Sequence, residues 1–256
     1  MIVPQTDDYR MSLRTDNEVS DRMQKNSLIE TNQPKSSQLS YSQVIFSYRF
    51  VFAFLTPFLW MMHFTAMEPI LAQRLLQLQL SQIQVGLFFC LLPFFYASIA
   101  ALTRTIPKWI EPRMRIIVAI TMTCLSFLCI GPSELLRFPD SILLMCIGQV
   151  LAGITGSQCL VSCLVEMIDD ANARNPNNYE AVAALSTGIY RCMYGIAQML
   201  GPVYGSTVNA YLGFKLTMDI LAFLDLAFGI AYFVLAGGHE AFTLTIARYR
   251  QRKPVN

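Results

Sequence analysis

Six long apolar blocks follow a polar head that covers residues 1–45. The blocks cover residues 49–71, 83–103, 116–131, 141–165, 181–206 and 214–236. A helix that crosses a bilayer needs about 20 mostly apolar residues, whereas surface helices of soluble proteins are amphipathic. The pattern therefore predicts an all-α integral membrane bundle of about six transmembrane helices. The last two blocks are the most polar, because they contain Arg191, Asp219 and Asp225.

The same pattern divides the chain into three parts. Residues 1–45 are polar and nearly neutral, which is typical of a disordered tail or linker. Residues 46–238 form the predicted transmembrane domain, and residues 239–256 form a basic tail. Because the gaps between blocks are short, consecutive helices are expected to be antiparallel neighbours.

Basic residues gather in two places that lie on one side of the membrane if the chain crosses it six times. They are Arg104, Lys108, Arg113 and Arg115 after the second block, and Arg248, Arg250, Arg252 and Lys253 in the tail. Cytoplasmic loops of membrane proteins carry an excess of lysine and arginine, so both termini are expected in the cytoplasm. Either the plasma membrane or an intracellular vesicle membrane is compatible with this prediction.

Composition argues against several other classes of protein. Only 14% of the residues are charged and the mean hydropathy is +0.43, whereas a soluble domain has roughly 25% charged residues. The net charge of +2 does not supply the basic surface of a nucleic-acid-binding protein. All seven cysteines fall inside apolar blocks without zinc-ligand spacing, which favours buried thiols over disulfides or metal sites. They are Cys90, Cys124, Cys129, Cys146, Cys159, Cys163 and Cys192.

Enzymatic functions find little support in the sequence. We find no glycine-rich phosphate loop and no cluster of metal-ligating residues in it, so no cofactor is expected. An intramembrane serine protease would need Ser157 to meet His239, which lies near the interface at the end of the last block. The prediction is therefore a membrane protein that is not an enzyme.

Two ionisable residues of the first block are site hypotheses, because ionisable groups in hydrocarbon are costly. His63 lies near the middle of the block. It either carries a proton, since imidazole titrates near physiological pH, or forms a hydrogen bond between helices. Glu68 lies near the outer end of the block, where it either attracts a cation or is an interfacial charge.

The fifth and sixth blocks suggest a charge pair. Arg191 lies about 9 residues into its block and Asp225 about 11 residues into the next, so a rise of about 1.5 Å per residue places both at similar depth. The two side chains are expected to pair, either structurally or as a gate. Glu166, with Asp169 and Asp170 beyond it, is expected in the headgroup region.

Polar and small residues repeat along the fourth and fifth blocks. Tyr190, Tyr194 and Gln198 share one helical face, which lines a polar cavity or forms an ordinary helix seam. Small residues let membrane helices approach closely, and a proline removes one helix hydrogen bond. The residues concerned are Gly148, Gly153 and Gly156 in the fourth block, and Gly195, Gly201, Pro202 and Gly205 in the fifth.

Several motifs, in order, resemble the C-terminal half of major facilitator superfamily transporters, nearest to the vesicular amine and polyamine branch of the drug–proton antiporters. They are Glu68-Pro69-Ile70-Leu71-Ala72, Leu80-Ser81, Val85-Gly86-Leu87-Phe88-Phe89, Gly131-Pro132-Ser133, Glu166-Met167 and Gly201-Pro202 with Gly205. Transporters of this superfamily have twelve helices in two halves, with the substrate site between the halves near the midplane.

The resemblance implies a secondary transporter that exchanges protons for a small organic cation such as an amine, by export or vesicular loading. It implies that His63 and Gln158 line the substrate cavity and that residues 1–45 derive from the loop joining the halves. A second six-helix half would then be needed, from a homodimer or a partner chain. The alternative is a non-transporting six-helix membrane protein, or an inactive half-transporter that acts only as an interaction subunit.

Overall fold

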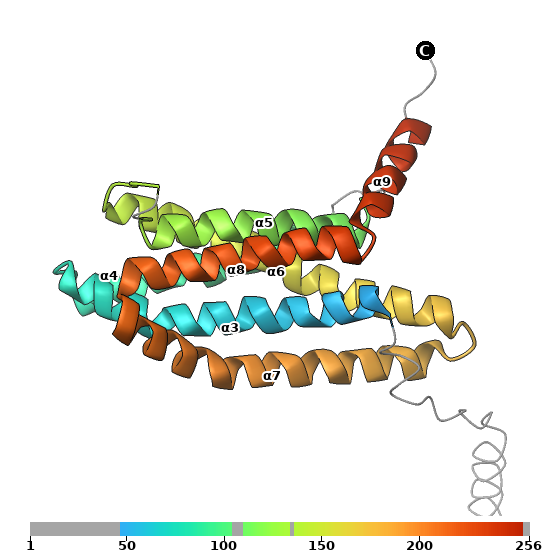
Figure 1. Ribbon diagram of the computed structural model, residues 1–256, viewed down its shortest axis with the longest axis horizontal. Coiled ribbons are helices and arrows are strands. Elements are labelled where there is room, and N and C mark those ends of the chain that lie inside the picture. The colour runs from blue at the N-terminus through green and yellow to red at the C-terminus, as the bar shows by residue number, and fades with distance from the viewer. Residues whose placement is uncertain (1–46, 104–109, 134–135, 253–256) are drawn as a thin grey trace, which may run out of the picture. The chain divides into compact units, whose positions relative to one another are not determined.

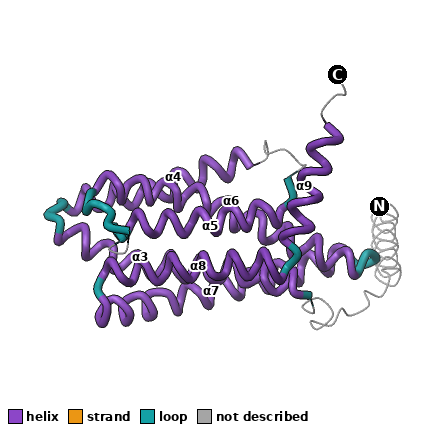
Figure 2. Tube along the Cα trace, turned by 45° about the horizontal axis from the view of Figure 1, so that its top comes forward, coloured by secondary structure: helices purple, strands orange, loops and turns teal. Residues whose placement is uncertain are grey.

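The computed structural model describes residues 47–103, 110–133 and 136–252. The predicted polar head therefore lies outside the described residues. All regular secondary structure in the described part is helical (Figure 2), which confirms the predicted all-α class. The helices are α3 (Tyr48–Gln77), α4 (Gln82–Leu102), α5 (Pro112–Ile130), α6 (Ile142–Arg174), α7 (Tyr179–Leu212), α8 (Phe214–Leu235) and α9 (Gly238–Arg252).

Each of the six apolar blocks coincides with one of the helices α3 to α8. Five of them, α3, α4, α5, α6 and α8, are both long enough and apolar enough to cross a membrane. Helix α7 is long enough, since its 34 residues extend about 50 Å, but it lacks a stretch as apolar as those of the other five. The basic tail, which the pattern left without an element, forms α9.

Neighbours in space are often not neighbours along the chain. Helix α3 packs most extensively against α7 (Figure 1) and makes far less contact with α4, which directly follows it. Helix α6 contacts α3, α4, α5 and α7 and forms the centre of the bundle. The expectation that consecutive helices are neighbours thus fails for α4 and α5 and holds only weakly for α3 and α4, because a short connection fixes the order of the helices but not the faces that pack.

Two glycines bring α3 and α7 into close parallel contact. A Cβ atom on Gly201 would lie 2.6 Å from the Met62 carbonyl oxygen, and one on Gly205 would lie 2.3 Å from the Ala66 carbonyl oxygen. The earlier glycine meets the earlier residue of α3 and the later glycine meets the later one, so the two helices run in the same direction. The predicted close approach is therefore confirmed at these two glycines. At Gly195 it is wrong, because that residue faces open space.

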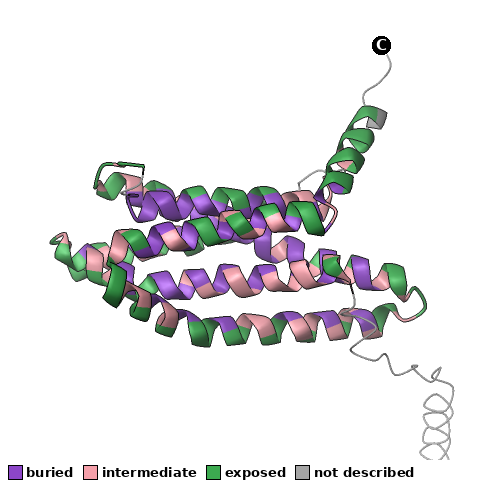
Figure 3. Cartoon of the chain, in the orientation of Figure 1, coloured by how far each residue is buried: buried purple, intermediate pink, exposed green. Residues whose placement is uncertain are grey.

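The glycines of α6 explain its central position. A Cβ atom on Gly148 would overlap Ile130 of α5, and one on Gly153 would overlap the Leu92 carbonyl oxygen of α4. A Cβ atom on Gly156 would overlap the Trp60 ring of α3. Three neighbouring helices thus approach α6 through positions where only glycine fits. Figure 3 shows the contrast between buried stretches of this bundle and the largely exposed α9.

Candidate functional site

The most buried acid–base contact of the described residues joins α3 to α8 halfway along both helices. His63 Nδ1 lies 2.8 Å from Asp225 Oδ1, and the two side chains are 0% and 1% exposed. Neither side chain has a hydrogen-bonding partner elsewhere among the described residues. The Phe127 ring of α5 meets the imidazole edge-on, with ring centroids 6.1 Å apart. An acid and an imidazole are thus enclosed together in an apolar environment.

The expected pair of Arg191 with Asp225 is wrong. Asp225 faces α3, whereas Arg191 is exposed on α7 and forms no ion pair within the described part of the chain. Residue counting predicted similar depths for Arg191 and Asp225, but depth does not determine the direction in which a side chain leaves its helix. The partner of Asp225 is instead His63, which lies near the middle of α3.

An aromatic pocket of about 420 Å³ lies between α3, α4, α6 and α7. Its walls include the stacked Trp60 and Phe64 rings of α3, whose centroids are 5.5 Å apart. The other lining residues are Met61, Glu68, Phe89, Leu92, Pro93, Tyr96, Gln149, Leu160 and Tyr194. Glu68 is the charged member of this lining, so the pocket carries net negative charge.

Gln149 is a feature of this pocket that the sequence interpretation missed. Its side chain is fully buried, and neither its amide nitrogen nor its oxygen has a partner in the described residues. A buried amide without a partner is unfavourable unless a ligand or water completes it. The signal was available in the sequence, since Gln149 interrupts an apolar run in the fourth block.

Gln158 lies elsewhere on α6, because nine residues separate it from Gln149 and place it on the opposite face. Its amide nitrogen donates a hydrogen bond to Thr103 Oγ1 at 3.0 Å. It lines a separate, largely apolar cavity of about 510 Å³ that includes Met114 and Arg115 of α5. His63 and Gln158, which the resemblance places in one cavity, are thus not in the aromatic pocket.

The predicted polar face of α7 divides between the pocket and the exterior. Tyr194 lines the aromatic pocket and stacks on the buried Tyr190, with ring centroids 6.3 Å apart. Arg191 and Gln198 are exposed. Pro202 lies within α7, which continues through it to Leu212.

A charge network occupies the end of the bundle where α3 and α5 begin. Glu166, at 1% exposure, lies 2.7 Å from Arg49 Nη2 and 3.3 Å from Arg113 Nε. Arg113 also donates hydrogen bonds to the carbonyl oxygens of Ala236 and Gly237. Two arginines thus hold the Glu166 carboxylate inside the end of the bundle, and its expected depth in the headgroup region stays a prediction.

Asp170 extends this network by one helical turn. It accepts a hydrogen bond from Arg174 Nη2 at 2.7 Å and lies 3.6 Å from Arg49 Nε. At the same end, Arg248 of α9 forms an ion pair with Glu111 at 2.7 Å. The two basic regions expected on one side of the membrane are thus at the same end of the bundle.

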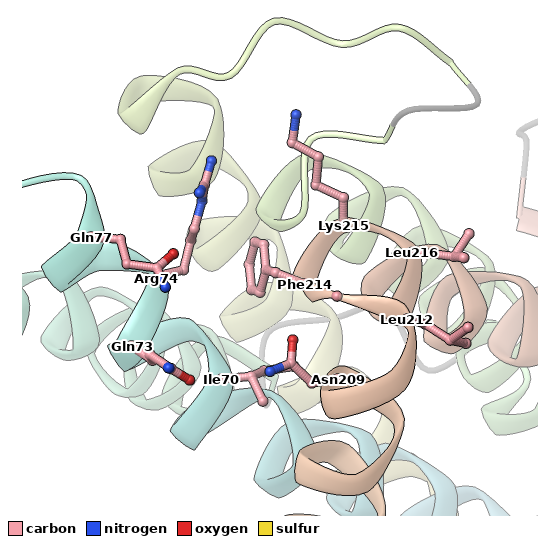
Figure 4. A pocket seen from close by; sticks show the side chains of 10 residues that line it. Ile70, Gln73, Arg74, Gln77, Asn209, Leu212, Phe214, Lys215 and Leu216 are labelled. Atoms are coloured by element: carbon pink, nitrogen blue, oxygen red, sulfur yellow. The ribbon is translucent and has the colours of Figure 1, made fainter.

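The opposite end carries a polar cavity of about 460 Å³ between the end of α3 and the α7–α8 turn (Figure 4). Arg74 lies 2.5 Å from Asp140, and Lys215 lies 3.5 Å from the same carboxylate. The turn itself needs Gly213, whose φ of 77° is strained for residues with a side chain. Both cations beside this cavity are already paired with an acid.

Two cysteines also depart from expectation. Cys90 and Cys192 are exposed on α4 and α7, whereas Cys124, Cys129, Cys159 and Cys163 are buried and Cys146 is half-buried. Apolar surface on a membrane helix can face lipid, so a position inside an apolar block does not by itself imply burial in protein.

Comparison with known proteins finds distant similarity to two transporters. The protein named MFS-type transporter SLC18B1 from rat is 23% identical over 112 residues, which are 44% of this chain and 24% of the relative. The mouse protein of the same name is 24% identical over 160 residues, which are 59% of this chain and 34% of the relative. The matches thus span about a quarter and a third of the relatives' lengths.

No family model matches the chain. No solved structure matches it. The two similarities and the five apolar helices together support an integral membrane protein, and both relatives are named as transporters.

Proposed function

We propose that the chain is a six-helix half of a major-facilitator-type secondary transporter that moves a small organic cation. The aromatic pocket between α3, α4, α6 and α7 is the observation that carries this proposal, and it supplies this half's share of the substrate site. Its volume of about 420 Å³ falls within the usual range for small-molecule sites.

The chemistry of the lining favours a cation. The Glu68 carboxylate supplies negative charge, and aromatic faces such as those of Trp60 and Tyr194 attract organic cations. The unpartnered Gln149 amide can accept a hydrogen bond from an ammonium group and can also bond a polar substituent. An anion would meet the carboxylate without a compensating basic group in the lining.

The exposed face of α7 supports the need for a second half. Arg191 and Gln198 are exposed on a helix that runs beside the apolar α3. A charged side chain facing lipid at membrane depth is costly, so this face is expected to border protein or a water-filled cavity. A second copy of this chain or a partner chain with six helices would provide both.

The proposal includes orientation and coupling. The end that holds the charge network and α9 would face the cytoplasm, because basic residues gather there. The substrate cation would exchange for protons, during export across the plasma membrane or loading of an intracellular vesicle.

Cation binding by the full chain in lipid nanodiscs tests the proposal. Radiolabelled tetraethylammonium, phenethylamine and spermidine serve as probes for quaternary, aromatic and polyamine cations. We expect Glu68→Gln to weaken binding of the preferred probe about tenfold, since it removes a charge contact. Glu180→Gln, at an exposed position at the start of α7, is the matched control and should bind normally.

Two results would contradict the proposal. One is the absence of saturable binding for all three probes, which would favour an interaction subunit. The other is equal affinity in the wild type and Glu68→Gln, which would place cation binding outside the aromatic pocket.

A further inference from the structure

The His63–Asp225 contact differs from every other acid–base contact in the described residues, because its basic member can lose its charge. The other pairs use arginine or lysine. Arginine stays protonated at any accessible pH, whereas imidazole titrates near pH 6.5 in water. This pair can therefore hold different numbers of protons.

The surroundings offer the pair little other electrostatic compensation. The titratable groups that face Asp225 from other helices are His63 on α3, the Cys124 thiol on α5 and the Cys159 thiol on α6. On α8 itself, Asp219 is also buried, and it adds no positive charge. No lysine or arginine of the described residues forms an ion pair with Asp225.

Charge counting then gives the proton number. With one proton shared between carboxylate and imidazole, the pair is neutral as a unit. With none it carries one negative charge, and with two it carries one positive charge. Both charged forms are penalised in an apolar interior, so the enclosed pair retains one proton at both mildly acidic and mildly alkaline pH.

We propose that His63 and Asp225 form a binding site for a single proton, which clamps the middle of α3 to the middle of α8. The proton leaves or a second one enters only when water reaches the pair, which requires α3 and α8 to separate. Protonation and the position of α3 are thereby linked.

The role of this link in transport rests on the proposed function, which the link extends. Trp60 and Phe64, which line the aromatic pocket, lie three residues before and one residue after His63 on the same helix. A movement of α3 that opens the clamp therefore also moves one wall of the pocket. Proton exchange and cation binding would then share one moving helix.

The pH dependence of stability tests the proton site without any substrate. Above about pH 6.5 the unfolded chain holds no proton on either residue, while the folded pair holds one. Stability is then fully present below pH 6.5 and falls as pH rises, with a tenfold change in the folding equilibrium per pH unit. Equilibrium unfolding in mixed detergent micelles between pH 6.5 and 8 measures this slope.

Two substitutions separate the contributions. Asp225→Asn leaves a neutral imidazole and no shared proton, so the wild-type slope should decrease by one proton. His63→Gln leaves Asp225, which must itself be protonated when buried, so the slope should remain. An unchanged slope in Asp225→Asn would overturn the proposal.

Histidine NMR on the wild type provides a measurement that does not depend on the variants folding. The chain has only two histidines, and the exposed His239 is an internal reference. The ring signals of His63 should not move between pH 5.5 and 8, unlike those of an imidazole exposed to water. Titration of His63 together with His239 would overturn the proposal, even if cation binding by the aromatic pocket succeeds. Failure of cation binding alone would instead contradict the proposed function.

Discussion

The Glu166 network and the His63–Asp225 pair are both buried acids next to basic groups, but they are built differently. Glu166 contacts two arginines at the end of the bundle, and one of them, Arg49, has a side chain that is 34% exposed. Asp225 contacts one histidine in the middle of the bundle, and both are almost completely enclosed. The arginines of the network keep their charge and one of them reaches water, whereas the histidine of the pair can lose its charge and neither member of the pair reaches water.

The difference suggests different roles for the two regions. Four chain segments meet at the network, since Arg113 binds both Glu166 and the carbonyl oxygens that follow α8. Its ion pairs do not depend on protonation of the basic partner. The pair joins only α3 and α8, and its strength depends on one proton. We therefore expect the network to stabilise the bundle and the pair to respond to pH.

Arg113→Ala should have the largest effect on stability. It removes a side chain that is only 5% exposed and leaves Glu166 with Arg49 alone. Breaking a buried ion pair typically costs about 3–5 kcal/mol of unfolding free energy. Equilibrium unfolding measures the loss, and Arg191→Ala is the control. A loss in Arg191→Ala as large as that in Arg113→Ala would remove the distinction between network and exterior.

Gly205→Ala should have the next largest effect, and it tests the side of α3 that packs against α7. The added Cβ atom would meet the Ala66 backbone, which cannot move cheaply. Overpacking of this kind costs about 1–3 kcal/mol. Gly195→Ala is the matched control, since its Cβ atom enters open space and alanine favours helix. Equal stabilities of the two variants would mean that the clamp with α8, and not packing with α7, positions α3.

The coupling between His63 and Asp225 should be smaller but measurable. In a double-mutant cycle with His63→Ala and Asp225→Ala, the double variant should be more stable than the sum of the single losses predicts. We expect an interaction of about 1–2 kcal/mol at pH 7. Additive losses would show that the 2.8 Å contact does not contribute to stability.

Arg74→Ala should have the smallest effect. Its side chain is 25% exposed, and Asp140 retains Lys215 as a second partner. Ion pairs of this type contribute about 0–1 kcal/mol. The change in unfolding free energy should thus fall below that of the His63–Asp225 coupling. A larger loss would indicate that side-chain exposure does not determine how much each acid–base contact stabilises this bundle.

The sequence predicted features that depend on position along the helices. Apolar length predicted the six helices, and basic residues predicted that the start of α5 and α9 lie at the same end. Counting residues placed Asp225 near the middle of its helix, where the structure has it. It did not identify His63 as the partner. Residue number sets how far along a helix a side chain lies, whereas the helix that it contacts depends on which helices pack against each other. The same reason explains why Gln149 was missed and Gln158 was preferred.

The glycines illustrate the same limit. Gly195, Gly201 and Gly205 are equivalent in the sequence pattern, but only the last two face α3. The burial of Glu166 was also hidden, because its arginine partners lie 117 residues before it and 53 residues before it on other helices. Contacts between distant segments require the three-dimensional arrangement.

Photo-crosslinking tests the central claim, that an organic cation binds in the aromatic pocket, most directly. An aryl-azide derivative of phenethylamine would be irradiated with the full chain in lipid nanodiscs, and labelled peptides would be identified by mass spectrometry. We predict labelling of α4 around Tyr96 and of α7 around Tyr194, reduced by unlabelled amine and by Glu68→Gln. Labelling confined to other helices, or unaffected by competitor, would contradict the claim.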